Sequence, residues 1–254
     1  MNNSLLMLTE LYGEFLGTFI LILLGNGVVA NVNLKSTYGS GGGWIVITTG
    51  WGLAVFTAVF MTADISGAHL NPAVTIGLAA AGLFDWVKVI PFILAQIAGA
   101  MFGAIMVYVF YRSHFKITET PGMKRACFCT APAIKNVRNN FFSEMIGTFV
   151  LVLGVLLVSL PEFQMEGMAS TKVGMGSLGA VPVALVVFVI GLSLGGTTGY
   201  AINPARDLGP RIVHALIPFR NNKDDNGWGY AWIPLIGPLT GAVLAALVYF
   251  TLIL

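Results

Sequence analysis

Long runs without charged residues dominate the chain. A helix that crosses a bilayer needs about 20 mostly apolar residues. Six uncharged runs of roughly that length or longer cover Phe15–Leu34, Trp44–Ala63, Val89–Tyr111, Met145–Pro161, Val173–Ala205 and Asn226–Leu254. We therefore expect six transmembrane helices, although the fourth run is slightly short and the fifth is too long for one helix.

A further uncharged run, Ile65–Phe84, has a different character. It begins with turn-forming residues, Ser66–Pro72, and only about a dozen helix-forming residues follow. The surplus of the fifth run repeats this design, because the glycine-rich segment Gly195–Tyr200 precedes Asn203, Pro204 and Ala205. Proline is well tolerated in the first helical turn. We therefore predict two loops that enter the membrane, each followed by a half-length helix.

The two halves of the sequence resemble each other. Residues 14–19 (EFLGTF) match residues 144–149 (EMIGTF) at a spacing of 130, and residues 66–73 match residues 198–205 at a spacing of 132. Each half holds three spans and one half-helix, so the second half inserts upside down relative to the first. Paired interruptions in inverted halves indicate a transport path. We expect one transmembrane domain over residues 1–254, with repeat 1 at about 8–112, a connecting loop at 113–139 and repeat 2 at about 140–254.

Glutamates inside spans are unusual, and intramembrane charges are functional by default. The repeat-related positions of Glu14 and Glu144 favour a supporting role, in which each accepts N–H groups from one re-entrant loop. The alternative is a proton relay of the kind a pump uses. Small residues four apart, at Gly99/Gly103 and Gly237/Gly241, predict close helix–helix contacts.

Composition agrees with a membrane protein, because 56% of the residues are hydrophobic and only 9% are charged, against about 25% charged in soluble domains. The net charge of +2 gives no reason to expect nucleic acid as a partner. Cys127 and Cys129 lie in a polar stretch without further ligands nearby, so we expect surface or loop thiols, no metal site and no cofactor.

The two Asn-Pro-Ala motifs, Asn71-Pro72-Ala73 and Asn203-Pro204-Ala205, with Arg206 directly after the second, resemble the aquaporin (major intrinsic protein) family. The resemblance covers essentially the whole chain. It implies an all-α membrane fold of six spans and two re-entrant half-helices, and a passive channel. It also assigns hydrogen-bond-accepting pore carbonyls to Gly67, Ala68, His69, Leu70, Gly199, Tyr200 and Ala201.

Helix physics supports this interpretation. Two helix N-termini that meet at the midplane each carry about half a positive charge, which repels cations. The side chains of Asn71 and Asn203 can offer N–H groups to a passing oxygen. A neutral solute can exchange its hydration for such a wall, whereas an ion cannot, as in aquaporin-type channels generally. His69 is expected to hold the first loop, and Asp207 to orient the second loop near Arg206.

The resemblance places a selectivity filter at Trp51, Gly191, Tyr200 and Arg206. Water-selective members typically carry histidine at the position of Gly191, and glycine makes room for a carbon backbone. Arg206 would fork hydrogen bonds toward hydroxyls. Arg206-Asp207 and Arg211 resemble the glycerol-facilitator pattern, although such proteins often have phenylalanine at the position of Tyr200.

These features imply conduction of glycerol, related small polyols and water. The alternatives are a mainly water- or urea-selective channel and a secondary transporter, which would need carboxylates around a central site. An enzyme is not expected, because no nucleophile–base or metal set lies within the spans.

The resemblance further implies a homotetramer in a plasma membrane, with both termini cytoplasmic. The positive-inside rule opposes that orientation. Only Lys88 and Lys172 would then lie inside, and the basic residues outside would be Lys35, Arg112, Lys116, Lys124, Arg125, Lys135, Arg138, Arg220 and Lys223.

Overall fold

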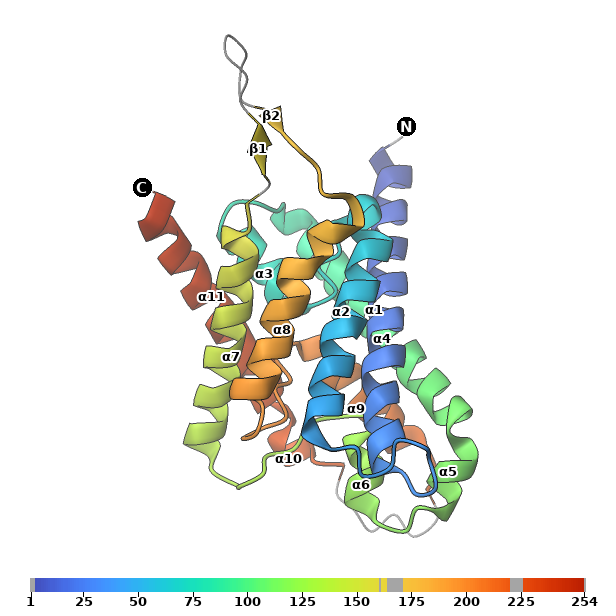
Figure 1. Ribbon diagram of the computed structural model, residues 1–254. Coiled ribbons are helices and arrows are strands. Elements are labelled where there is room, and N and C mark those ends of the chain that lie inside the picture. The colour runs from blue at the N-terminus through green and yellow to red at the C-terminus, as the bar shows by residue number, and fades with distance from the viewer. Residues whose placement is uncertain (1–2, 160, 164–170, 220–225, 254) are drawn as a thin grey trace.

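The structure is a bundle of long, roughly aligned helices (Figure 1). It is a computed structural model that describes residues 3–159, 161–163, 171–219 and 226–253. Six helical segments of the described chain are long and apolar enough to cross a membrane. They contain α1 (Asn3–Asn33), α2 (Gly43–Ser66), α4 (Trp86–Phe110), α7 (Val137–Leu157), α8 (Val181–Ser193) and α11 (Ile233–Ile253). The prediction of six spans is confirmed.

Two shorter helices lie inside the bundle. Helix α3 (Pro72–Ala80) and helix α9 (Pro204–Leu216) each begin with the proline of an Asn-Pro-Ala motif. Figure 1 places α3 in the half of the bundle near both chain ends and α9 in the opposite half. The two half-helices therefore enter from opposite faces, as the inverted halves of the sequence predicted.

Two spans begin earlier than predicted. Helix α1 starts at Asn3, although the uncharged run starts only at Phe15, and α7 starts at Val137 instead of Met145. The cause is the same in both, because a buried glutamate interrupts the uncharged run without ending the helix. Glu14 and Glu144 are both 0% exposed. From the sequence alone, a glutamate at such a position looks like the charged end of a span, because its buried partners are not visible there.

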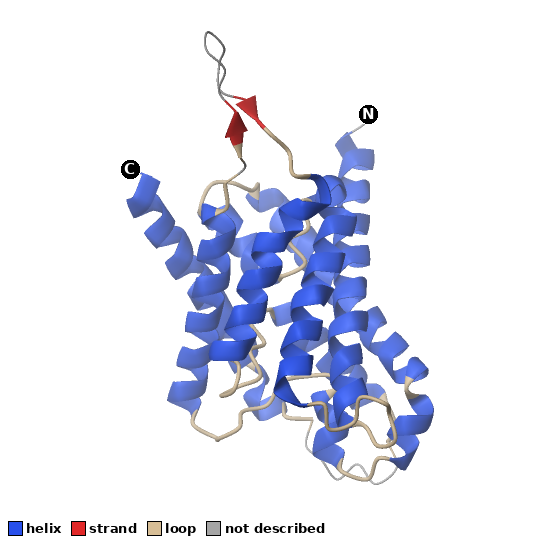
Figure 2. Ribbon diagram, viewed as in Figure 1, coloured by secondary structure: helices blue, strands red, loops and turns tan. Residues whose placement is uncertain are grey.

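The connections contain more structure than expected. The segment between the halves carries α5 (Arg112–Ile117) and α6 (Pro121–Ala126), and a 3-10 turn η1 (Gly176–Ala180) precedes α8. Helix α10 (Trp228–Ala231) precedes α11. The all-α fold class is confirmed, and one connection adds a short hairpin: β1 (Glu162–Phe163) pairs antiparallel with β2 (Thr171–Lys172) between the fourth and fifth spans (Figure 2).

The predicted glycine pairs lie at helix–helix contacts. A Cβ atom added to Gly99 or Gly103 of α4 would meet the carbonyl oxygens of Phe15 or Phe19 on α1. A Cβ atom on Gly241 of α11 would likewise meet the carbonyl oxygen of Met145 on α7. These glycines bring one outer helix of each half close to the helix that carries the buried glutamate.

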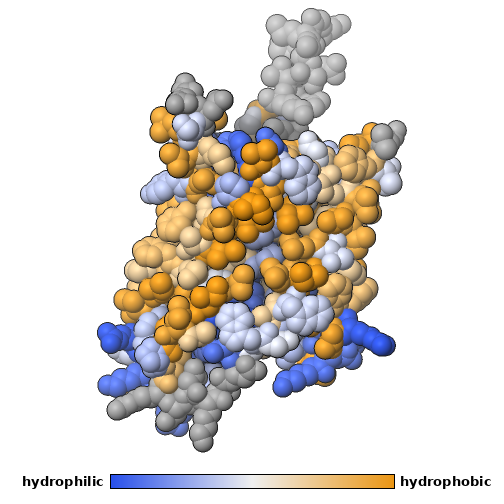
Figure 3. Space-filling model, turned by 180° about the vertical axis from the view of Figure 1, so that it is seen from behind, coloured by the Kyte–Doolittle hydropathy of each residue, from blue (hydrophilic) through white to orange (hydrophobic). Residues whose placement is uncertain are grey.

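The outer surface matches a bilayer. Hydrophobic residues cover the middle of the molecule, and hydrophilic residues gather toward its ends (Figure 3). Large apolar side chains such as Leu53, Leu94, Val109 and Leu247 are more than half exposed. An exposed apolar band around a helical bundle is the surface that hydrocarbon solvates and water does not.

Candidate functional site

Two irregular loops lead into the half-helices with the same backbone pattern. In the first loop φ is positive at Gly67, Ala68 and Leu70, and in the second at Gly199, Tyr200 and Ile202. The matching positions are 132 residues apart. The left-handed region costs roughly 1–2 kcal/mol for a non-glycine residue, so the surroundings must hold both loops in place.

A buried carboxylate holds the first loop. Glu14 Oε1 accepts from the backbone N–H of His69 at 2.9 Å, and Glu14 Oε2 accepts from that of Leu70 at 2.8 Å. The Ser66 hydroxyl and the Gln96 side-chain amide donate to the same carboxylate, each at 2.7 Å. Four donors therefore surround one charge that bulk water does not reach.

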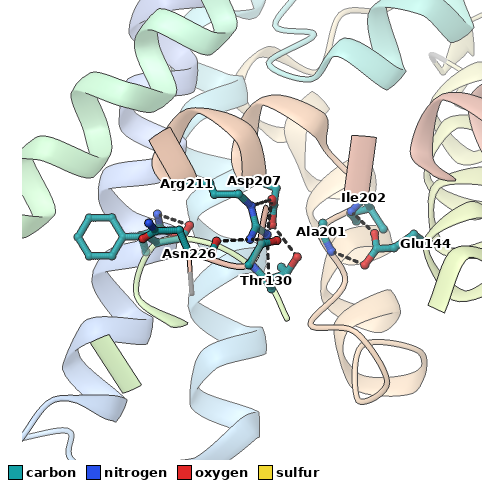
Figure 4. Close-up of polar contacts among 10 residues, drawn as sticks. Thr130, Glu144, Ala201, Ile202, Asp207, Arg211 and Asn226 are labelled. Carbon is teal, nitrogen blue, oxygen red and sulfur yellow. Dashed lines mark hydrogen bonds and ion pairs between the residues drawn. The ribbon is translucent and has the colours of Figure 1, made fainter. Parts of the chain in front are cut away.

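Glu144 occupies the corresponding place in the second half (Figure 4). Its two carboxylate oxygens accept from the backbone N–H groups of Ala201 at 3.0 Å and Ile202 at 2.8 Å. Both glutamates thus make the contacts that their repeat-related positions led us to expect. Neither lines the inner cavity described below, which speaks against a proton relay.

His69 sits beside the first motif. Its Nδ1 lies 3.2 Å from the Thr75 hydroxyl oxygen, and its ring packs against Phe84 and Phe92 at centroid distances of 4.6 and 5.3 Å. The residue also lines the inner cavity. The contacts place the ring between the first loop, α3 and α4, which suits the predicted holding role.

The two motifs meet and bond to each other. The side-chain amide of Asn71 donates to the carbonyl oxygen of Ile202, and that of Asn203 donates to the carbonyl oxygen of Leu70, both at 2.8 Å. Each Asn Oδ1 also caps its own half-helix by accepting the N–H of Ala73 or Ala205. An Asn amide carries two N–H donors, so one N–H per motif is left for a solute.

The reciprocal bonds change one part of the predicted carbonyl set. Leu70 was predicted to present a pore carbonyl, and in the structure this oxygen accepts one hydrogen bond from Asn203, which occupies one of its two lone pairs. Ile202, its counterpart in the second half, was not predicted and has the same role. Both residues line the inner cavity together with Gly67, Ala68, His69 and Ala201.

An inner cavity of about 290 Å³ is lined by residues of both motifs. One part of its wall is the polar backbone of the two loops, with Asn71 and Asn203. The remaining wall is largely aliphatic and includes Leu21, Val55, Val59, Val74, Leu78, Leu151, Val155, Val183 and Val187. The cavity therefore offers hydrogen bonds on one side and apolar contact on the other.

A second, outer cavity of about 270 Å³ adjoins it. The residues that line both cavities are Trp51, Tyr200 and Arg206. The guanidinium carbon of Arg206 lies 4.4 Å from the centroid of the Trp51 ring, a cation–π contact. Within the described residues, Arg206 Nη1 and the Tyr200 hydroxyl are buried without a hydrogen-bond partner. Three of the four predicted filter residues thus converge at one constriction.

Gly191, the fourth, lies behind the constriction and lines neither cavity. A Cβ atom there would lie 2.9 Å from Tyr200 Cζ and 3.0 Å from the Tyr200 hydroxyl. The Gly191 carbonyl accepts from Trp44 Nε1 at 2.9 Å, and the Trp44 ring meets Tyr200 edge-on at 5.7 Å. The Tyr200 ring therefore occupies the space that a side chain at position 191 would need. That space is not part of the lumen.

Asp207 has different partners from those predicted (Figure 4). Its carboxylate accepts from the backbone N–H and hydroxyl of Thr130 at 2.8 and 2.6 Å and pairs with Arg211 at 2.7 Å. Arg211 also donates to the carbonyls of Thr130 and Asn226. Asp207 therefore ties the first turn of α9 to the connecting segment, whereas Glu144 holds the second loop.

The two cysteines are loop residues but not surface residues. Cys127 and Cys129 are 0% and 2% exposed. Burial, together with the Asp207 carboxylate, raises the pKa of the Cys129 thiol to about 12, and burial also raises the pKa of Cys127. Both groups therefore stay protonated at neutral pH. Among the described residues, no cluster of three His, Cys, Asp or Glu side chains could hold a metal ion.

Several residues of the site were missed. Gln96, Trp44 and Thr130 carry contacts described above, and Arg211 was noted only as a pattern marker. Gln96 was detectable, because an uncharged polar side chain in the middle of a span needs a buried partner. The others depend on contacts between distant segments, which have no local signal.

Comparisons with known proteins agree with this geometry. The sequence profile of the family "Major intrinsic protein" matches residues 1–249. The chain is 54% identical to the glycerol uptake facilitator protein of Streptococcus pneumoniae, over 96% of this chain and 99% of that protein. It is 49% identical to glycerol uptake facilitator protein 3 of Lactiplantibacillus plantarum, over 94% and 95% of the two chains. The X-ray structure of the aquaglyceroporin from Plasmodium falciparum superimposes with a TM-score of 0.82 at 35% identity, covering 97% of both chains.

The contacts of Glu144 generate a stability prediction. Glu144→Gln replaces one of the two acceptor oxygens by an amide nitrogen, which cannot accept, so either the Ala201 or the Ile202 N–H loses its partner. An unsatisfied buried donor costs about 2 kcal/mol, so the apparent melting temperature in detergent should fall by roughly 4–8 °C. Glu10→Gln is the matched control, because it breaks only the partly exposed pair with Lys88 and should cost at most about 1 kcal/mol. Equal effects of the two substitutions would contradict the assignment.

Proposed function

The chain belongs to the major intrinsic protein family, and we propose that it is a passive channel for glycerol, related small polyols and water that excludes ions and protons. As a member of this family it is a multi-pass membrane channel and not an enzyme. The observation that carries the proposal is the constriction of Trp51, Tyr200 and Arg206 between the two cavities.

Glycerol fits this constriction on chemical grounds. It has a hydroxyl on every carbon and a face of C–H groups. The unpartnered Nη1 of Arg206 can donate to hydroxyls, while the faces of Trp51 and Tyr200 accommodate the carbon chain. Beyond the constriction the same division continues, with loop polar groups on one side and aliphatic side chains on the other. Both glycerol uptake facilitators named above support the same solute class.

Ions are excluded by two positive elements in series. The guanidinium of Arg206 lies at the constriction, and the N-termini of α3 and α9 meet further inside at Asn71 and Asn203. Each N-terminus contributes about half a positive charge. A cation would have to lose hydration water beside these charges, with no carboxylate among the described lining residues to compensate. Water and polyols carry no charge and replace their lost hydrogen bonds along the loops.

The alternatives make different demands on the same residues. A channel restricted to water or urea would need a narrower or more polar constriction than these two aromatic faces provide. A secondary transporter would need carboxylates at a central site, but Glu14 and Glu144 already bind loop N–H groups. Passive conduction of glycerol therefore agrees best with the lining residues.

We propose the remaining features of the assembly from the family resemblance. Residues 1–254 form one channel domain in two inverted halves, and four copies assemble with one pore each. The protein resides in the plasma membrane with both termini in the cytoplasm. The two chain ends lie on the same face of the bundle (Figure 1), which suits an even number of spans. The basic residues of the connecting segment then face outward against the positive-inside rule, although Arg220 and Lys223 lie outside the described residues.

Solute flux tests the function directly. Purified protein in liposomes is mixed with hyperosmotic glycerol, and vesicle volume is followed by light scattering. We expect fast shrinkage as water leaves and then fast re-swelling as glycerol enters, without an ion gradient and without saturation. Protein-free liposomes should re-swell slowly. Slow re-swelling with protein present would identify a water channel, and saturable or gradient-driven entry would identify a transporter.

The packing of Tyr200 against Gly191 predicts a change in selectivity. Gly191→His inserts a side chain 2.9 Å from Tyr200 Cζ, and this overpacking should push the ring toward Arg206 and narrow the constriction. Glycerol flux should fall by about tenfold or more, with a smaller fall in water flux because water is the smaller solute. Gly27→Ala is the control, since a Cβ atom there has no atom within 4 Å and Gly27 lines neither cavity. An equal loss of both fluxes would refute the size argument.

The charge of Arg206 predicts ion exclusion. Arg206→Val removes the cation at the constriction but leaves both half-helices in place, so proton or cation leakage should become measurable with a pH-sensitive dye inside liposomes. Arg138→Val, at an exposed position, should change nothing. If the Arg206 variant stays impermeable to ions, the half-helix dipoles alone provide the barrier.

A further inference from the structure

A third cavity, of about 660 Å³, lies outside the transport path. It is bounded by the end of α4, by α5 and α6, and by Pro218 and Phe219 after α9. It shares no lining residue with the inner or outer cavity. Conduction of glycerol does not explain it.

The charge of this cavity is positive. Arg112, Lys116 and Lys124 line it against one acidic residue, Glu119. Within the described residues none of these four side chains forms an ion pair.

Lys124 is the unusual member of this group. It is only 6% exposed, yet its ammonium has no hydrogen-bond or ion-pair partner in the described part of the chain and lies 5.6 Å from the centroid of the Phe219 ring. Most of the Lys124 side chain is thus desolvated, while the residue lines the cavity without a counter-ion. Its place at the wall of a cavity points to an anionic ligand.

Aromatic rings hold that ammonium in position. Phe219 packs against Tyr108 and Phe115 at centroid distances of 5.6 Å in both cases, and Tyr108 and Phe115 are 5.5 Å apart. Phe115 is 1% exposed. The wall of the cavity therefore combines a packed cluster of aromatic rings with basic side chains.

The cavity also lies where the bilayer ends. Tyr108 is in the last turn of α4, and Arg112 begins α5 after the single residue Tyr111. One turn deeper Ile105 is 42% exposed, and Ile117 at the end of α5 is 45% exposed. Figure 1 places α5 and α6 at the end of the bundle away from both termini. Acyl chains can reach this apolar surface while a headgroup contacts the basic side chains.

We propose that this cavity binds a phosphate group, carried by the headgroup of an anionic phospholipid in the leaflet opposite the termini. The three basic side chains neutralise the phosphate, and the neighbouring apolar residues contact the acyl chains. A soluble phosphate shares the headgroup chemistry but not the apolar contact, and the experiment separates the two sources.

Native mass spectrometry of the purified full chain would count bound phosphatidylglycerol, with phosphatidylcholine as the neutral lipid. We expect Lys116→Gln to weaken phosphatidylglycerol binding by about fivefold and Lys124→Gln by about tenfold. Lys135→Gln, an exposed lysine of the same connecting segment outside the cavity, should leave binding unchanged. Thermal stabilisation by inorganic phosphate is measured on the same variants.

The possible outcomes distinguish a lipid, a soluble phosphate and the absence of an anion site. Selective loss of phosphatidylglycerol binding in the two cavity variants supports the lipid. Phosphate stabilisation that the same variants lose, without preference for phosphatidylglycerol, assigns the site to a soluble phosphate and overturns the lipid. Equal effects of all three substitutions, or no preference for an anionic ligand, overturn the site itself. Glycerol flux in liposomes serves as the folding control, and if Lys124→Gln does not fold, Lys116→Gln and Arg112→Gln decide.

Discussion

Hydrocarbon offers no hydrogen bonds, so any backbone that leaves a helix at membrane depth must find its partners inside the protein. The whole site depends on how the two re-entrant loops meet this demand. Glu14 and Glu144 each accept two consecutive backbone N–H groups. With the donors of each loop bound on its far side, carbonyl groups can face the cavity. The two buried glutamates, which are unusual inside a membrane, therefore permit a polar path through it.

The asparagines of the two motifs both stabilise the fold and line the conduction path. Each side chain caps its half-helix, bonds to the opposite loop and keeps one N–H for the path. The same contacts hold two helix N-termini face to face, an arrangement that like-signed dipoles disfavour. Polar solutes in the path offset part of that repulsion by presenting oxygen atoms to both ends. The ion barrier is thus a consequence of the scaffold and does not require a separate device.

A feature can be predicted from the sequence when the residues that determine it lie close together along the chain. Span number and the two half-helices follow from run length and from turn chemistry before each Asn-Pro-Ala motif. The start of α1 does not, because Glu14 resembles a boundary until its loop partners are known. The partner of Asp207, Thr130, lies 77 residues away, and the contact of Trp44 with Gly191 spans 147 residues. The place of Gly191 behind the constriction follows from these long-range contacts, whereas its filter assignment came from resemblance alone.

The two inverted halves have the same loop supports but different residues at the constriction. At a spacing of 132 residues, Ala68 corresponds to Tyr200 and Val74 to Arg206. All four line the inner cavity, so the same two backbone positions are small and apolar in one half and large or charged in the other. The glutamates, the motif asparagines and the positive φ values stay symmetric. Symmetry is therefore kept where the backbone needs support and lost at the two constriction positions, where we propose that solutes are selected.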